Sequence, residues 1–363
     1  MFSFRTTSLD DQPDRALIHG RVGCFCTQNC WDTATGRYMY EIFHRRGNLA
    51  KVFTPSEAEL TYDGGSHIEF SEDMFVGLNA IVVEIQDSGA RCFGYTRDVL
   101  RLMSLLDAMD RETSTEEECA VPSLYIVDHP NPAGRIVEGT MPVLESEPWT
   151  AKVAHRHGLT LGEICHVHYS ELGARFPLHI ISAEASESNR ALMPWAIAPS
   201  AEVPGLFSCQ LQGGGCLWEF TTVSPGLGTP RPYEYIGAPF VSPDLGDLPQ
   251  AEGALLRPCS FRPASGQYKG ERCYGYQILL TGGEEYHCLL HTIQVMRYMK
   301  EHYSQFDFLP GFETRLADPV IWEYLKGNIT FDIVQEHVKG EEQKWIRKAK
   351  RYTLYEELPY RIK

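Results

Sequence analysis

The sequence predicts an α/β protein in which a Rossmann-like, mostly parallel sheet has helices on both faces, followed by a smaller C-terminal α+β domain. Three observations lead to this prediction. Short apolar runs alternate with amphipathic stretches through the first two thirds of the 363 residues, as is typical of parallel strands joined by helices. Polar, turn-forming residues end most of these runs. A Gly/Pro-rich tract at 212–239 then separates them from a different pattern.

Six short apolar runs are the predicted strands. In chain order they lie at 20–26, 49–53, 80–85, 123–127, 178–182 and 195–198. Helices are predicted between them at 33–46, 97–109 and 161–170, where apolar residues recur with helical spacing. The last of these helices has Thr160 before its first residue and Glu163 three residues later, which is the spacing of a capping box.

The tract at 212–239, which contains Gly213–Gly215, is interpreted either as the passage between two domains or as an ordered loop that crosses the cleft between them. We therefore expect a Rossmann-like domain over 1–212 and a smaller domain over 213–363 that closes the cleft. In this second domain the sequence predicts a strand at 275–280 and a long helix at 285–303. Three shorter helices are predicted at 319–326, 330–338 and 340–351.

The composition excludes some classes of partner. A net charge of −15 argues against nucleic acid as the main partner, because binding a phosphate backbone requires a basic face. No stretch approaches the ~18 apolar residues of a membrane helix, and the N-terminal residues lack a signal-peptide pattern. The 11 cysteines form no compact disulfide pattern, which favours a reducing compartment. We therefore expect a cytoplasmic protein that binds neither membranes nor nucleic acid. The sequence does not indicate its oligomeric state.

Polar residues at the ends of the predicted strands are the first candidates for a functional site. Ligands of open α/β sheets bind beyond the carboxyl ends of the strands. The carboxylates near these ends, or at the helix start that follows, are Glu57, Glu59, Asp87, Asp128 and Glu163. Arg91 and two amides in the same segments, Gln86 and Asn131, are predicted to hold a substrate. Two plainer interpretations stay open: these residues begin loops, and Asp87 caps the next helix.

The segment 155–163 reads His-Arg-His-Gly-Leu-Thr-Leu-Gly-Glu. Arg156 lies just before a helix start, a place that favours anions, so it is suited to clamp a substrate carboxylate with two hydrogen bonds. His155 and His157 fit a metal site only with further ligands. The alternative is that both histidines are buried and bonded to loop backbone. Because a buried Glu84 would need a partner, Arg91 or Arg97 is expected to supply it.

The sequence contains none of the glycine-rich nucleotide-binding motifs and no cysteine pairs with metal-ligand spacing. We therefore predict neither a nucleotide cofactor nor a bound metal.

Several motifs, in this order along the chain, resemble those of the NamZ-like exo-β-N-acetylmuramidases, a family long described as a domain of unknown function. The motifs are EIQDSGAR at 84–91, DHPNPAG at 128–134, VEG at 137–139, RHGLTLGE at 156–163 and TPRPYEYIGAP at 229–239. The resemblance covers nearly the whole chain. It implies a site in the cleft between the two domains and hydrolysis that releases terminal N-acetylmuramic acid from peptidoglycan fragments. The substrate would then be a small amino sugar or muropeptide, whose lactyl carboxylate suits Arg156.

The chain departs from the family at several polar positions. The family's Pro-Glu-His-Gly, whose Glu is thought to be catalytic, is replaced by Pro55-Ser56-Glu57-Ala58-Glu59, and its Ser-Glu-Gly-Arg-Gly-Thr has lost a Glu and an Arg at 224–229. The resemblance thus implies Glu57 as the acid, with Glu59 as its substitute. Candidates for the second catalytic role are Asp87, Asp128 and Glu163. Residues expected to orient the sugar are Arg156, His157, Asn131 and Glu219.

Two functions follow from this pattern. The first is a glycoside hydrolase that acts on imported or recycled muropeptide fragments or a related amino sugar. The second is a catalytically degenerate sugar-binding or regulatory protein on the same fold, which the altered polar motifs favour. A metal-dependent hydrolase that uses His155 and His157 is a weaker third.

Overall fold

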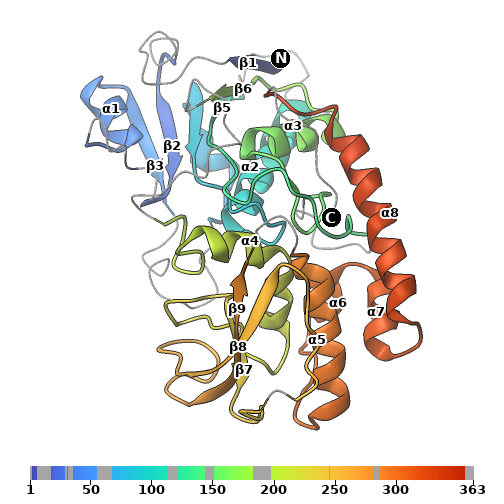
Figure 1. Ribbon diagram of the computed structural model, residues 1–363. Coiled ribbons are helices and arrows are strands. Elements are labelled where there is room, and N and C mark those ends of the chain that lie inside the picture. Colours follow the sequence, from blue (N-terminus) through green and yellow to red (C-terminus); the bar gives the residue numbers. More distant parts are fainter. Residues whose placement is uncertain are drawn as a thin grey trace.

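The computed structural model describes residues 2–5, 18–28, 31, 36–54, 68–112, 121–143, 151–182, 198–244, 246–281 and 286–355. Two sheets organise this part of the chain. The larger sheet and its helices form the upper half of the molecule in Figure 1, and the smaller sheet lies below with helices α5–α7. Helix α8 runs along one side of the molecule. None of the described helices is long and apolar enough to cross a membrane.

The larger sheet has six strands in the order β1-β6-β5-β4-β2-β3. The strands are β1 Phe2–Arg5, β2 Val22–Cys26, β3 Leu49–Phe53, β4 Ala80–Glu84, β5 Ser123–Asp128 and β6 Leu178–Ser182. All neighbouring pairs are parallel. Five of these strands lie where the sequence predicts them, while β1 is an additional edge strand. The run predicted at 195–198 lies almost wholly outside the described residues.

The strand order changes direction between β2 and β4, because the chain moves outward from β2 to β3 and then returns to pair β4 with β2. Such a switch point opens a crevice beyond the carboxyl ends of the two central strands. Cys26 and Glu84, the last residues of these strands, pair with each other across it. The crevice is therefore where the fold places a ligand.

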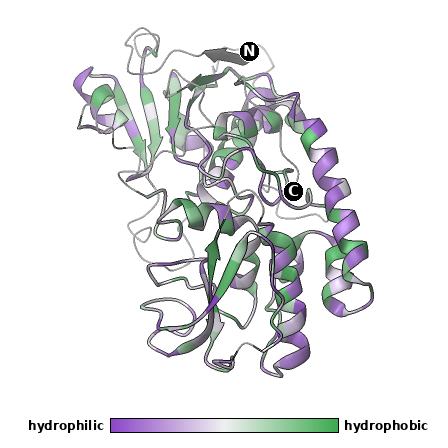
Figure 2. Ribbon diagram, in the orientation of Figure 1, coloured by the Kyte–Doolittle hydropathy of each residue, from purple (hydrophilic) through white to green (hydrophobic). Residues whose placement is uncertain are grey.

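Helices cover both faces of this sheet, which confirms the predicted fold class. Helix α1 spans Met39–Arg45, α2 spans Gly94–Glu112 and α3 spans Leu161–Leu172. Residues such as Phe25 and Ile126 lie on one face and pack with α2 and α3 in one apolar cluster, while Cys24 and Val82 pack with Met39 of α1 in another. Figure 2 shows that the central strands are largely apolar, as expected of parallel strands buried on both sides.

The capping box predicted at the start of α3 is present. Glu163 N donates to Thr160 Oγ1 at 3.2 Å, and Thr160 N donates to Glu163 Oε2 at 3.0 Å. Gly173 then ends the helix with a positive φ of 62°, a conformation that glycine adopts without strain.

The glycines at 213–215 lie in a helix, so the interpretation of this part of the tract as a loop was wrong. Helix α4 spans Leu206–Gly215, and the 3-10 helix η6 follows over Cys216–Phe220. A Cβ added at Gly214 would lie 2.6 Å from the backbone N of Leu289, at the start of α5. The glycine is thus explained by the close approach of two helices, a signal that the sequence does not separate from a turn.

The second part of the chain contains a small antiparallel sheet in the order β7-β9-β8 and four helices. The strands are β7 Tyr235–Ala238, β8 Ala254–Phe261 and β9 Cys273–Leu280; the helices are α5 Cys288–His302, α6 Phe312–Leu316, α7 Pro319–Lys326 and α8 Phe331–Ala349. The predicted strand at 275–280 and the helices at 285–303 and 319–326 correspond to β9, α5 and α7.

The two helices predicted at 330–338 and 340–351 are a single helix, α8. The predicted break lies next to Gly340, but Gly340 is inside the helix, and a Cβ added there would meet nothing within 4 Å. Buried side chains on both sides of it, Val338 and Trp345, hold the helix against its neighbours. Tertiary packing therefore offsets the low helix propensity of one glycine.

The main core of the larger sheet and the core of the smaller sheet are separate, and the chain passes between these two cores inside helices. Cys209 of α4 packs in the first core, whereas Leu211, half a turn later, packs in the second. Helix α8 takes the chain back from the second core to the first, because Val334 lies in the second core and Trp345 in the first. The domain boundary at 212–213 stays a prediction, but the C-terminal half of α8 packs with the first sheet.

Candidate active site

A pocket of about 250 Å³ lies where the two parts of the chain meet. One wall comes from the segment that follows β4 and from the 155–157 loop, and the other from η6 and α6. Residues of the walls include Arg91, Cys92, Arg97, His155, Cys216, Phe220, Thr314 and Arg315. One wall of the pocket thus comes from the segment that follows the central strand β4.

Arg91 fastens the two walls of this pocket together. Its Nη1 donates to the carbonyl of Thr140 at 2.8 Å, and its Nη2 donates to the carbonyls of Arg315 and Leu316 at 3.2 and 3.1 Å. Burial lowers the pKa of Arg91 to about 10, so the guanidinium is still charged at neutral pH. Because its donors are directed at backbone carbonyls, Arg91 supports the pocket and is not free to clamp a substrate.

Glu219 lies beside the same pocket, on η6. Its Oε1 accepts a hydrogen bond of 3.0 Å from Tyr233 Oη. Burial raises the pKa of Glu219, while the charge of Arg315 and the hydrogen bond from Tyr233 oppose the rise. A carboxyl group that keeps its proton to a higher pH than usual is suited to donate that proton.

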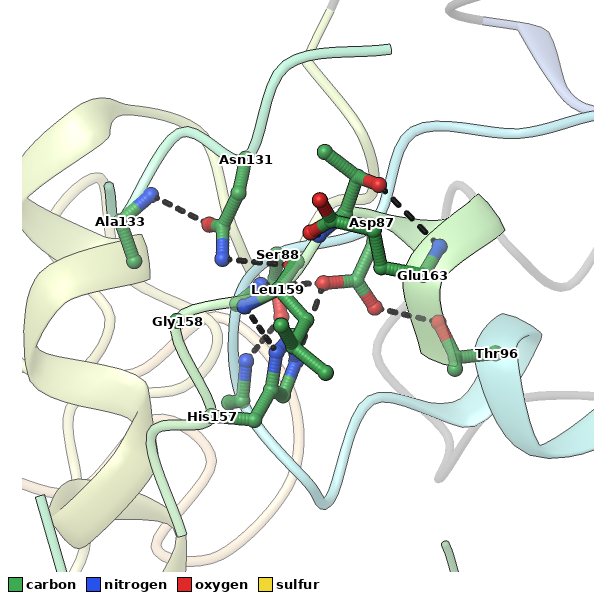
Figure 3. A network of polar contacts seen from close by, with 12 residues as sticks. Asp87, Ser88, Thr96, Asn131, Ala133, His157, Gly158, Leu159 and Glu163 are labelled. Carbon is green, nitrogen blue, oxygen red and sulfur yellow. Dashed lines mark hydrogen bonds and ion pairs between the residues drawn. The ribbon is translucent and has the colours of Figure 1, made fainter. Parts of the chain in front are cut away.

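Asp87 and His157, two predicted site residues, meet in a buried network (Figure 3). Asp87 accepts from Gly89 N at 2.6 Å and from the Thr96 hydroxyl. His157 Nε2 lies 3.2 Å from Asp87 Oδ1, within ion-pair distance but not aligned as a hydrogen bond. His157 Nδ1 accepts from Leu159 N at 3.1 Å, which places the ring proton on Nε2, facing Asp87.

The two amides predicted to hold a substrate are also engaged in this region. Gln86 Nε2 donates to the carbonyls of Asp87 and Pro130, both at 2.9 Å. Asn131 Nδ2 donates to Leu159 O at 2.8 Å, and its Oδ1 accepts from Ala133 N at 2.8 Å (Figure 3). The strand-end residues therefore do gather, but as an internal network that fixes the loops.

Asp128 is buried at the end of β5 and accepts three hydrogen bonds. They come from Thr160 Oγ1 at 2.6 Å, Gly162 N at 2.7 Å and Tyr355 Oη at 2.7 Å. Burial raises the pKa of Asp128 to about 6, although all three hydrogen bonds oppose the rise. The carboxylate joins β5 to the start of α3 and to the C-terminal segment, which is a structural task.

Glu163 is equally enclosed. Its two oxygens accept from both terminal nitrogens of Arg135, from Thr160 N at 3.0 Å and from Leu354 N at 2.9 Å. Its side chain has no exposed surface. With every oxygen engaged, Glu163 has no position left for a substrate, and the geometry favours a structural role.

Glu84 lies beside His129, and Arg91, one of its two predicted partners, does not pair with it. His129 Nε2 lies 3.1 Å from Glu84 Oε1, whereas Arg91 turns toward the backbone carbonyls of the pocket wall. Both side chains of the pair are largely buried, with 22% and 15% of their surfaces exposed. The predicted acids Glu57 and Glu59 lie outside the described residues.

The pocket residues that the sequence analysis missed are mainly Cys216, Phe220 and Arg315. They come from η6 and α6. Nothing in the sequence distinguishes Arg315 from an ordinary surface arginine, because it lies in a single helical turn outside any recognised motif. Only the fold brings it opposite Arg91, 224 residues earlier in the chain.

The fold and the pocket together define a two-part α/β protein in which a pocket lined by Arg91, Arg97 and Arg315 lies where the two parts meet. Two family profiles match the chain: "Exo-beta-N-acetylmuramidase NamZ, N-terminal" over residues 62–206 and its C-terminal counterpart over 212–355. The protein is a divergent member of this family. The resemblance found in the sequence motifs is therefore confirmed.

Individual relatives agree with this assignment. The peptidoglycan β-N-acetylmuramidase NamZ of Bacillus subtilis (strain 168) is 24% identical over 299 residues, which span 78% of this chain and 69% of that protein. Two solved structures of DUF1343 family proteins from Bacteroides fragilis NCTC 9343 share the fold. Their TM-scores are 0.77 and 0.74 at 18% and 20% identity, and each comparison covers 96% of this chain and 97% of the other.

Proposed function

We propose that the protein is a muramidase-like glycoside hydrolase that releases a terminal N-acetylmuramic acid, or a related amino sugar, from peptidoglycan-derived fragments. The match of both halves of the chain to exo-β-N-acetylmuramidase profiles supports this class of activity. The observation that carries the proposal is the pocket between these halves, which has Glu219 beside it and arginines in its walls.

Hydrolysis adds water across the glycosidic bond. One carboxyl group gives its proton to the leaving oxygen while the bond to the anomeric carbon breaks. The water oxygen bonds to that carbon, and its proton goes to a second group. Glu219 suits the first task, because burial keeps it protonated to a higher pH. Glu57, with Glu59 as its substitute, remains our other candidate for the acid, from the family resemblance.

Asp87, Asp128 and Glu163 were predicted for the second catalytic role, and in our proposal they serve the scaffold instead. Each is buried and accepts hydrogen bonds from backbone or side-chain groups that position the loops around the pocket. Catalysis would then depend on these residues indirectly, through the placement of the segments that carry Arg91 and His155.

The test is hydrolysis of two substrates by purified protein: N-acetylmuramyl-β-1,4-N-acetylglucosamine and 4-nitrophenyl β-N-acetylmuramide. The disaccharide has a poor leaving group that needs the acid, whereas nitrophenolate leaves without much help. We expect the wild type to cleave both. In the variant that lacks the acid, the rate of hydrolysis of the disaccharide should fall roughly 10²–10⁴-fold, and the rate for the nitrophenyl sugar should fall far less.

The variants to compare are Glu219→Gln, Glu57→Gln and Glu59→Gln. Glu252→Gln is the matched control, since Glu252 is exposed and remote from the pocket walls, and it should stay within about twofold of the wild type. Absence of cleavage of both substrates by the wild type would refute a muramidase-like activity.

A second function, a sugar-binding or regulatory protein without turnover, is favoured by one observation. Three of the five carboxylates predicted to be catalytic are tied into structural hydrogen bonds. This alternative predicts that N-acetylmuramic acid raises the melting temperature of the protein while neither substrate is cleaved. The cytoplasmic location and the role in recycling stay predictions that cell fractionation would test.

A further inference from the structure

Arg315 has the only pocket-lining guanidinium for which the described part of the chain shows a ring contact but neither a hydrogen bond nor an ion pair. Its guanidinium carbon lies 4.8 Å from the centre of the Phe220 ring. The side chain is half-buried. Arg315 thus brings five N–H donors to the pocket on an aromatic support.

The other arginines near the cleft have identified partners. Arg91 donates to four backbone carbonyls, those of Thr140, Val153, Arg315 and Leu316. Arg156 donates to Glu138 and to Ala133 O, and Arg135 donates to Glu163. Arg97 also lines the pocket, and it too interacts with another group of the protein. Arg315 is therefore the guanidinium that is available to a ligand.

The charges around Arg315 favour an anionic ligand. Arg91, Arg97 and Arg315 all line the pocket. Of the carboxylates, Asp318 interacts electrostatically with Arg91 and Glu219 with Arg315. Asp318 is committed elsewhere, to the start of α7 and to His337. A guanidinium that stacks on a ring exposes its donor edge, which matches the two oxygens of a carboxylate.

We propose that Arg315, supported by Phe220, binds the carboxylate of the substrate and so selects acidic amino sugars over neutral ones. This proposal rests on the proposed function and deepens it. It replaces Arg156, the residue predicted from the sequence for this task, with a residue from the opposite wall of the pocket. Arg315 acts on specificity by holding a substituent, and its charge also lowers the pKa of the proposed acid Glu219.

The experiment compares N-acetylmuramyl-β-1,4-N-acetylglucosamine with its lactyl methyl ester, which has the same shape but no charge. We expect the wild type to prefer the acid in kcat/KM by about tenfold to a hundredfold, as is typical of hydrogen bonds to charged groups. Arg315→Gln should lower kcat/KM for the acid to the level of the ester. The ester itself should change less than about threefold.

Two further variants make the test specific. Arg315→Lys keeps the charge but loses the planar donor edge, so it should retain only part of the preference. Arg272→Gln is the control, because Arg272 is an exposed arginine of β9's start whose loss changes the net charge equally. It should keep the full preference. Equal losses on both substrates in Arg315→Gln, or a wild type that treats acid and ester alike, would overturn the proposal.

A binding readout separates this proposal from the proposed hydrolysis. N-acetylmuramic acid should raise the melting temperature of the wild type and of Arg272→Gln, but not of Arg315→Gln, and its methyl ester should have little effect on any of them. Protection of this kind without turnover supports the role of Arg315 and refutes the hydrolase. Turnover without any preference for the acid refutes the role of Arg315 alone.

Discussion

Arg156 and Glu138 form a buried ion pair in which Arg156 Nη1 lies 2.7 Å from Glu138 Oε1. Their backbones also exchange two hydrogen bonds of 3.0 Å, so side chain and main chain fix the same two residues. On the far side of Glu138, its Oε2 lies 3.5 Å from His287 Nδ1 at the start of α5. The pair therefore connects the 155–157 loop to the second core.

Arg156→Met should destabilise the protein, because it leaves the Glu138 carboxylate buried without its partner. Breaking a buried pair in this way costs about 3–5 kcal/mol. Urea unfolding measures the effect, and the double variant Arg156→Met/Glu138→Leu should regain part of the stability. If Arg156→Met instead leaves the urea midpoint unchanged and raises the KM for N-acetylmuramyl substrates, Arg156 binds the substrate carboxylate as the sequence predicted.

Gly214→Ala and Gly340→Ala should act in opposite directions, although both glycines lie in helices. At position 214 a Cβ would lie 2.6 Å from Leu289 backbone atoms, so α4 and α5 must separate, and we expect a loss of roughly 1–3 kcal/mol. At position 340 nothing lies within 4 Å, and alanine should add about 0.5–1 kcal/mol. Chemical denaturation of both variants checks this, and similar shifts in both would contradict the packing argument.

Asp128→Asn should remove a pH dependence of stability. The pKa of Asp128 is raised from 3.8 to about 6 by burial, so the folded state holds this proton more tightly than the unfolded chain. The stabilisation that comes from protonated Asp128 is complete below pH 3.8 and is lost as the pH rises to about 6. The stability of the wild type relative to Asp128→Asn should thus fall over this range, by at most roughly 3 kcal/mol.

Urea unfolding at several pH values between 4 and 7 measures this difference. If the stability difference between the wild type and Asp128→Asn instead grows with pH, the three hydrogen bonds to the carboxylate affect its pKa more than burial does.

Glu219→Gln should change the pH profile of hydrolysis as well as its rate. Because burial raises the pKa of Glu219, the acid form persists to a higher pH than for an exposed Glu, and activity should fall as the pH rises through that pKa. The glutamine variant should lack this alkaline limb. Tyr233→Phe removes a hydrogen bond that lowers the pKa of Glu219. In this variant the fall in activity at alkaline pH should therefore occur at a higher pH. An unchanged profile in both variants would exclude Glu219 as the acid.

Local signals in the sequence predicted much of the fold. The capping box of Thr160 and Glu163 involves residues three apart and formed as expected. Strand positions followed from short apolar runs, and the bounds of β3 and β6 match the prediction. The glycines at 213–215 and at 340 were misread, because a glycine marks a turn, a close helix contact or neither, and only the neighbours decide.

The site was harder to predict, because its properties depend on partners far away in the chain. From the sequence, Arg156 is suited to bind a substrate carboxylate, but in the structure its guanidinium pairs with the carboxylate of Glu138. For Asp87 the sequence favoured catalysis and capping of the next helix equally, and its hydrogen bonds from the Thr96 hydroxyl and the Gly89 amide support the scaffold role that we propose. Arg315 gave no signal, since its role depends on the Phe220 ring and on the absence of an internal partner in the described structure.

Helix α8 begins in one core and ends in the other, and α4 crosses between the same two cores. Two connections through helices restrain the relative motion of the two cores more than a single linker would. The pocket walls that carry Arg91 and Arg315 are therefore held at a more nearly constant separation.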